Sequence, residues 1–140
     1  MKKRCLSLVI QNRQPVLLRG EDTVSTACRL MRERPTGAVL VVDADERLRG
    51  IFTGRDAVRL LAEGRQAADT LLIEAMTPDP HTIGPEATSI DALREMADRG
   101  FRHLPVVEGG RILGVVSRGD FKGMELERLG DETTLWERIC

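Results

Sequence analysis

Two short stretches, GIFTGRD at residues 50–56 and GVVSRGD at residues 114–120, place the same chemical groups in the same order. In each stretch a glycine and two apolar residues precede a hydroxyl, and an aspartate follows three residues later. A hydroxyl can donate to a phosphate oxygen, and a carboxylate has two acceptor oxygens that suit the vicinal hydroxyls of a ribose. A strand that leads into a helix also offers free backbone N–H groups to an anion. Both stretches therefore have the groups to hold a ribonucleotide, but neither has a base to activate water.

The same tetrads also fit a plain structural role. Thr53–Asp56 and Ser117–Asp120 have the spacing of a helix capping box, and Thr88–Asp91 has it at another predicted helix start. A cap needs only the tetrad, however, whereas these two turns also share a glycine inside the turn, Gly54 or Gly119. Glycine at such a place lets a ligand approach the backbone. Both interpretations, a cap and a ligand site, stay open at this point.

The two stretches belong to a longer internal repeat. An offset of 65 residues aligns the halves of the chain, pairing Pro15 with Pro80, Glu21 with Glu86, Thr23 with Thr88, Ala27 with Ala92, Met31 with Met96 and Val41 with Val106. After residues 43–49 the offset becomes 64, which pairs Gly50 with Gly114 and Asp56 with Asp120. Two copies with so long a period indicate a paired globular unit rather than a solenoid.

Each copy predicts the element order β-α-β-β-α. The expected elements are extended pieces at 15–18 and 80–83, helices opened by Thr23 and Thr88, apolar strands at 38–42 and 104–107, return strands at 51–52 and 115–116, and second helices at 57–62 and 121–129. A copy of this size buries too little surface alone, so we expect an α+β fold of two repeats related by a pseudo-twofold axis. The expected parts are 1–66 for the first repeat with the N-terminal segment, 67–125 for the connector and second repeat, and 126–140 for a helical tail.

Composition excludes several classes of protein. The 140 residues carry a net charge of −1, which provides no field to gather a nucleic acid. No apolar run approaches the roughly 20 residues of a membrane helix, and the N-terminus lacks a signal-peptide pattern, so we expect a cytoplasmic protein without membrane contact. His81 and His103 are far apart, and the three cysteines are scattered, which argues against a metal site. The chain also has no P-loop or nucleophile–base pattern, and we expect no enzyme and no catalytic cofactor.

The doubled turn, together with residues 76–121, resembles a tandem cystathionine β-synthase (CBS) domain pair, or Bateman module, over residues 7–125. The resemblance implies an adenosine-containing ligand, namely AMP, ADP or ATP, with NAD and S-adenosylmethionine as less frequent choices. It also implies roles for matching positions: Asp56 and Asp120 on ribose hydroxyls, Thr53 and Ser117 on phosphate with Arg55 and Arg118 nearby, Thr82 and Ile83 along the adenine, and Arg102 and His103 reaching phosphate. In the first copy Leu17, Leu18, Gly37 and Ala38 replace the last four, so we expect unequal sites.

The resulting hypothesis is a stand-alone regulatory module. It binds an adenine nucleotide, senses energy or cofactor status, and modulates a separate protein whose identity the sequence does not give. The apolar tail, which contains Trp136, favours a homodimer. The alternatives are a ligand-free structural or dimerisation module and a weak nucleic-acid binder that uses edges such as RGFRH at residues 99–103.

Overall fold

The chain forms two compact units in the computed structural model, which describes residues 5–34 and 36–121. The first unit is Pro15–Pro80, and the second unit joins the N-terminal residues up to Gln14 to the residues from His81 onward. The expected boundaries differ from this division at both ends. The N-terminal segment packs with the second repeat instead of the first, and the whole connector, residues 67–80, packs with the first repeat instead of the second.

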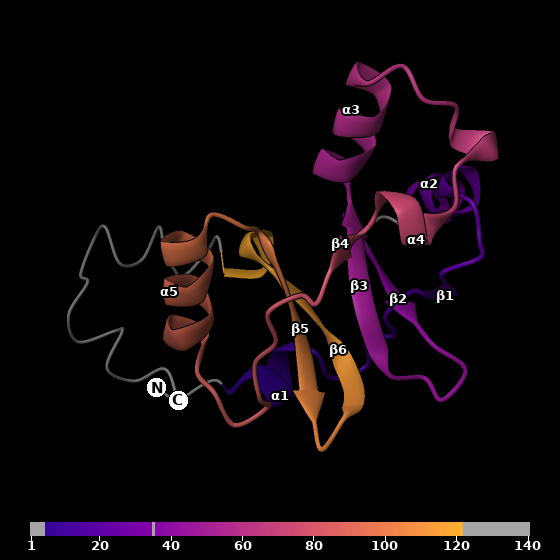
Figure 1. Ribbon diagram of the computed structural model, residues 1–140. Coiled ribbons are helices and arrows are strands. Elements are labelled where there is room, and N and C mark those ends of the chain that lie inside the picture. Colours follow the sequence, from indigo (N-terminus) through magenta and orange to yellow (C-terminus); the bar gives the residue numbers. More distant parts are fainter. Residues whose placement is uncertain (1–4, 35, 122–140) are drawn as a thin grey trace. The chain divides into compact units, whose positions relative to one another are not determined.

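The first unit is built on a four-stranded sheet with the order β1-β2-β3-β4 (Figure 1). The strands are β1 (Leu17–Arg19), β2 (Ala38–Val42), β3 (Leu48–Thr53) and β4 (Thr77–Pro78). Strand β1 is parallel to β2, whereas β2 and β4 are both antiparallel to β3. The helices of this unit are α2 (Val24–Glu33), α3 (Gly54–Ala62), the 3-10 turn η1 (Ala67–Asp69) and α4 (Leu72–Ala75).

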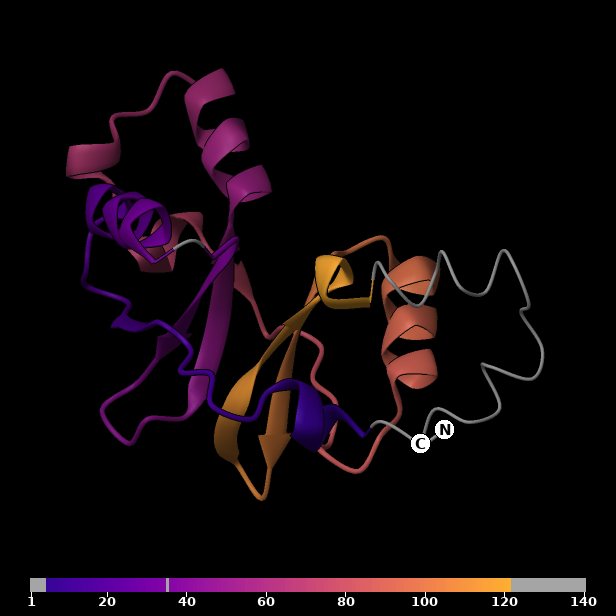
Figure 2. The same cartoon turned by 180° about the vertical axis from the view of Figure 1, so that it is seen from behind.

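The second unit repeats this plan with a smaller sheet. Its elements are α1 (Leu6–Val9), α5 (Ser89–Arg99), β5 (His103–Glu108), β6 (Arg111–Ser117) and the 3-10 turn η2 (Arg118–Phe121). Strands β5 and β6 form an antiparallel hairpin, and α1 lies across it, as Figure 2 shows. Of the predicted helix 121–129 only Phe121 is described, within η2, and the tail 126–140 lies outside the described residues.

Strand register confirms the repeat position by position. The equivalent pairs are Leu18 opposite Val41 and Ile83 opposite Val106, Ala38 opposite Thr53 and His103 opposite Ser117, and Val41 opposite Gly50 and Val106 opposite Gly114. Both hairpins also carry a register shift at the same place, after Val41 and after Val106. The irregularity therefore belongs to the repeated unit, and the sequence offsets of 65 and 64 residues correspond to equivalent places in space.

Each repeat buries its own core between its helices and its strands. In the first unit Val24 and Ala27 of α2 pack with Val39 and Phe52, and in the second unit Met96 of α5 packs with residues of β5 and β6. The predicted caps orient these helices. The Thr23 side chain accepts from the backbone N–H of Thr26 at 3.2 Å, and Thr88 forms the predicted capping box with Asp91. No helix in the described part of the chain is both long and apolar enough to cross a membrane.

The glycine that begins each motif, Gly50 or Gly114, makes room for a side chain from a segment outside that motif. A Cβ on Gly50 would collide with the Met76 side chain, and a Cβ on Gly114 would lie 3.0 Å from Cβ of Ile10. Met76 follows α4, and Ile10 follows α1. The two short helices therefore hold equivalent places, one against each repeat, and this packing brings residues 11–14 and 77–80 toward the two motif turns.

Candidate functional site

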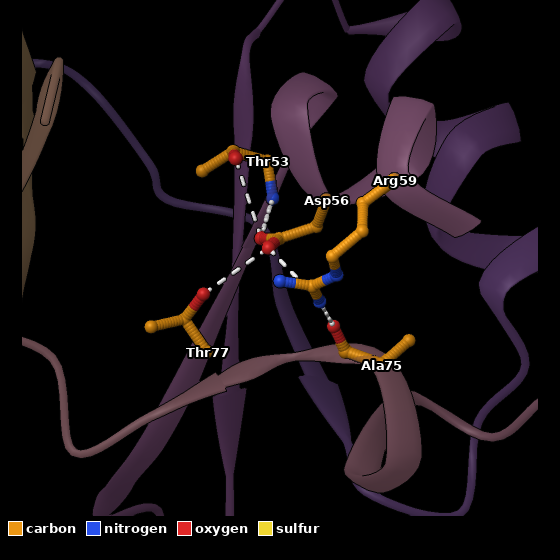
Figure 3. Close-up of polar contacts among 5 residues, drawn as sticks. All are labelled: Thr53, Asp56, Arg59, Ala75 and Thr77. Atoms are coloured by element: carbon orange, nitrogen blue, oxygen red, sulfur yellow. Dashed lines mark hydrogen bonds and ion pairs between the residues drawn. The ribbon is translucent and has the colours of Figure 1, made fainter. Parts of the chain in front are cut away.

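Asp56 caps helix α3 with one of its two carboxylate oxygens (Figure 3). Its Oδ2 accepts a hydrogen bond from the backbone N–H of Thr53 at 2.9 Å and another from the Thr53 hydroxyl at 3.3 Å. The aspartate's half of the predicted capping box is therefore present at this turn, because the carboxylate reaches back to the Thr53 N–H. It uses Oδ2 and leaves Oδ1 for a different partner.

Two side chains hold Oδ1 of Asp56. The Thr77 hydroxyl donates to it at 3.1 Å, and Nη2 of Arg59 lies 3.3 Å away. The same Arg59 nitrogen donates to the carbonyl of Ala75 at 2.7 Å, which ties α3 to α4. Asp56 is only 4% exposed. Its charge is thus compensated inside the first unit, and a sugar hydroxyl reaches Oδ1 only after Thr77 or Arg59 has moved.

Asp120 in the second unit divides its oxygens in the same way but has a different partner. Its Oδ2 accepts from the backbone N–H of Ser117 at 2.7 Å. Its Oδ1 forms an ion pair with Nη1 of Arg13 at 2.7 Å. The side chain of Asp120 is 15% exposed and that of Arg13 is 45% exposed, so this carboxylate is more accessible than that of Asp56.

Other predicted site residues gather at the same end of the β5–β6 hairpin. His103 lies opposite Ser117, and the backbone N–H of Arg118 donates to the carbonyl of Arg102 at 2.9 Å. Burial lowers the pKa of His103 and outweighs the negative charge of Asp120, which acts in the opposite direction, while the positive charge of Arg102 lowers it further. The imidazole is therefore mainly neutral at pH 7, and this end of the hairpin combines one carboxylate, arginines and a neutral histidine.

The predicted adenine-lining pair lies farther along the same hairpin. Ile83 is half-buried; its N–H donates to the carbonyl of Pro105 at 3.0 Å, and its carbonyl accepts from Val107. Thr82, next to it, is exposed. Val106, the residue opposite Ile83, is three strand positions from His103, or about 10 Å along β5. This spacing is comparable to the length of a nucleoside, so Thr82 and Ile83 stand apart from the charged end of the site.

The first repeat brings fewer of these groups together. Thr53 ends β3, and Arg55 and Asp56 follow it as the motif predicts. Gly37 and Ala38, however, occupy the places of Arg102 and His103 and bring no charge there. A Cβ on Gly54 would meet no atom within 4 Å, and one on Gly119 would meet only the Ser117 hydroxyl, at 3.7 Å. Both turns thus have an open backbone, although the two surroundings differ.

Sequence reasoning missed three residues that contact the aspartates, namely Thr77, Arg59 and Arg13. The sequence held no clear signal for them, since the segments 6–10 and 72–76, which precede Arg13 and Thr77, are both apolar at only three of five equivalent positions. Among the described residues no group of three or more histidine, cysteine or acidic side chains is placed to hold a metal ion.

The fold and the site define a tandem module of two β-α-β-β-α repeats, each with a hydroxyl–aspartate turn at the end of its hairpin. The sequence pattern of the CBS domain matches the chain twice, at residues 9–63 and 72–124. The chain therefore belongs to the CBS domain family, as the resemblance of its two turns implies.

A curated relative is the CBS domain-containing protein CBSCBSPB2 of Arabidopsis thaliana, 41% identical over 95 residues. The match covers 67% of this chain but only 18% of the plant protein. The chain thus spans about a fifth of the length of the curated relatives that it first matches.

Solved structures show the same fold over nearly the whole chain. A CBS-domain containing protein from Agrobacterium tumefaciens matches with a TM-score of 0.80 and 27% identity, covering 89% of this chain and 95% of that one. A CBS domain protein from Pyrobaculum aerophilum, complexed with AMP, matches with a TM-score of 0.80 and 21% identity over 90% and 98% of the two chains. A hexameric CBS-CP12 protein from bloom-forming cyanobacteria matches with a TM-score of 0.75 and 28% identity over 83% and 69%.

Proposed function

We propose that this CBS domain pair is a regulatory module that binds an adenine nucleotide of the AMP, ADP or ATP type and modulates a separate protein. The observation that carries the proposal is that the two oxygens of the Asp120 carboxylate have different partners. Oδ2 caps the turn through the Ser117 N–H, and Oδ1 points to an exchangeable partner. The capping role and the ribose role are therefore compatible in one side chain, because each uses a different oxygen.

The groups around Asp120 match the parts of a nucleotide. Oδ1 accepts from a ribose hydroxyl, while Ser117, Arg118, Arg102 and His103 supply donors for the phosphate at the same end of the hairpin. The half-buried Ile83 side chain and the exposed Thr82, about 10 Å along β5, provide apolar and polar surface for the adenine. The AMP complex of the Pyrobaculum protein supports this assignment, since it shows that a protein of this fold holds such a ligand.

The two sites are proposed to be unequal, with the second repeat as the principal one. Oδ1 of Asp56 already has two partners, and the first repeat lacks the arginine that precedes β5 and the histidine that begins it. A ligand binds to Thr53, Arg55 and Asp56 only if the contacts between α3 and the connector are broken. The same sensor thus has one accessible site and one that is largely occupied by its own side chains.

Thermal unfolding with AMP, ADP, ATP, NAD and S-adenosylmethionine tests the proposal. A ligand present at a hundred times its Kd stabilises the folded chain by about 2.7 kcal/mol, which raises the Tm. We expect an increase with at least one adenine nucleotide and none with a pyrimidine nucleotide such as CMP. A Tm unchanged by every adenine compound contradicts the sensor and favours a structural module. An effect of oligonucleotides alone, strongly dependent on salt, favours a nucleic-acid binder.

We further propose a homodimer that uses the exposed face of α3. Val58 and Leu61, three residues apart on this helix, are 65% and 71% exposed, which is unusual for aliphatic side chains so close together. The hexameric CBS-CP12 protein supports self-association of this fold. The expected location is cytoplasmic, where adenine nucleotides are available.

Leu61→Glu is expected to weaken the dimer about tenfold or more, because it places a charge at the centre of the apolar face. Sedimentation equilibrium measures the effect. Leu8→Glu, the same change at an exposed leucine of α1, is the matched control. Equal dissociation of the two variants, or none, contradicts the use of α3.

A further inference from the structure

Arg13 reaches Asp120 from a turn that is built into the second unit. Ile10 packs on Gly114, Asn12 adopts a left-handed backbone conformation with φ of 67°, and the backbone N–H of Arg13 donates to the carbonyl of Ile10 at 3.0 Å. This turn delivers the guanidinium to Oδ1 of Asp120 at 2.7 Å. The contact therefore follows from the anchoring of α1 rather than from a chance encounter of two surface charges.

The ion pair occupies the one carboxylate oxygen that the cap does not use. Oδ2 is committed to the Ser117 N–H, so a ribose hydroxyl that binds to Asp120 takes over Oδ1 from Arg13. The Arg13 side chain is nearly half exposed, and water solvates its charge when the pair separates. Arg13 is thus a partner that a ligand can displace.

Displacement of Arg13 from Asp120 has different consequences when the ligand is a nucleoside and when it is a nucleotide. Adenosine takes Oδ1 and offers no anion to the released guanidinium, which stands on the same unit as Arg102 and Arg118. AMP takes the same oxygen but brings a phosphate, with which a guanidinium forms strong charge-assisted hydrogen bonds. The exchange is therefore unfavourable for adenosine and nearly balanced for AMP.

We propose that Arg13 is a specificity-determining residue that makes the Asp120 site select phosphorylated over unphosphorylated adenosine. The inference rests on the proposed function of that site. In the free protein Arg13 occupies the ribose-binding oxygen, and in the complex it turns to the phosphate. The chain thereby binds adenosine more weakly than AMP through charge alone.

Titration calorimetry of the full chain with AMP and with adenosine tests the inference. We expect Arg13→Gln to bind adenosine more tightly and AMP no more tightly than the unaltered chain. The ratio of the two Kd values then falls about fivefold, the effect of one exposed ion pair. Arg13→Lys keeps the charge and is expected to retain most of the selectivity.

Arg49→Gln is the matched control, because it removes an exposed arginine whose ion pair with Asp43, at 3.0 Å, lies in the first unit. The ratio of its Kd values for adenosine and AMP is expected to equal that of the unaltered chain. The Tm of each variant without ligand reports on folding. An unaltered ratio in Arg13→Gln, with both ligands still bound, overturns the role of Arg13 alone. If neither AMP nor adenosine binds to the unaltered chain or the variants, the proposed function is overturned and the inference with it.

Discussion

Asp120→Ala is expected to abolish the stabilisation of the chain by adenine nucleotides while the protein stays folded. The variant loses the acceptor for the ribose hydroxyls and the cap on the Ser117 N–H. The lost cap lowers the free energy of unfolding by about 1 kcal/mol. The gain of about 2.7 kcal/mol that a saturating nucleotide gives the unaltered chain should disappear. Thermal unfolding with and without AMP measures both effects in one experiment.

Asp91→Ala separates the two roles of such an aspartate. Asp91 accepts from the backbone N–H of Thr88 at 3.0 Å and caps α5 as Asp120 caps its own turn. Unlike Asp120, Asp91 is not among the proposed ligand-binding residues. The loss of the cap should cost a similar free energy in both variants, whereas Asp91→Ala should keep the response to AMP. An Asp120→Ala variant that responds to AMP as strongly as Asp91→Ala shows that the carboxylate only caps the turn.

Asp56→Ala is expected to have the largest effect on stability of the changes considered, a loss of about 2–3 kcal/mol. The substitution removes the cap of α3 and the acceptor for the Thr77 hydroxyl, and it separates Arg59 from its carboxylate in a largely buried place. Urea denaturation should show a lower midpoint with an unchanged slope, since the fold itself is retained.

The free energy of unfolding of Asp56→Ala is best compared with that of Asp120→Ala without nucleotide, because Asp120→Ala lacks the equivalent aspartate of the other repeat. We expect it to be clearly more stable than Asp56→Ala, since its Oδ1 loses only a half-exposed arginine. Equal losses in the two variants would mean that the contacts of Thr77 and Arg59 add nothing to the cap. A response of Asp56→Ala to AMP is expected to persist, because the principal site is in the second repeat.

Local patterns in the sequence predicted most of the fold. The strand at 38–42 corresponds to β2, and the helices after Thr23 and Thr88 begin where their caps place them. These features depend on interactions between near neighbours, such as a hydroxyl three residues from an N–H. The repeat then supplied the pairing of distant strands, because equivalent offsets predict equivalent registers.

Features that depend on distant packing could not be derived in this way. The N-terminal segment was expected with the first repeat, but Ile10 packs on Gly114 of the second, and Met76 packs on Gly50 of the first. Neither contact leaves a pattern in the local sequence, because a glycine that accommodates a side chain resembles a glycine in a turn. The boundary of each unit therefore depended on which segment packs on Gly50 and which packs on Gly114.

The candidate site was predicted in the same uneven manner. The sequence identified Asp56 and Asp120 and left open whether each caps a helix or binds a sugar. The structure assigns the cap to Oδ2 in both repeats and shows that the partners of Oδ1 differ, Thr77 and Arg59 in one and Arg13 in the other. Those partners come from segments outside the motif, so their identity required the tertiary fold.

The most direct test of the account is a crystal structure of the chain grown with saturating AMP. We predict that Oδ1 of Asp120 accepts from a ribose hydroxyl at about 2.5–3.0 Å, that Oδ2 remains on the Ser117 N–H, and that Arg13 has left the carboxylate. A structure without nucleotide at this site, in which Arg13 is still paired with Asp120, would contradict the account.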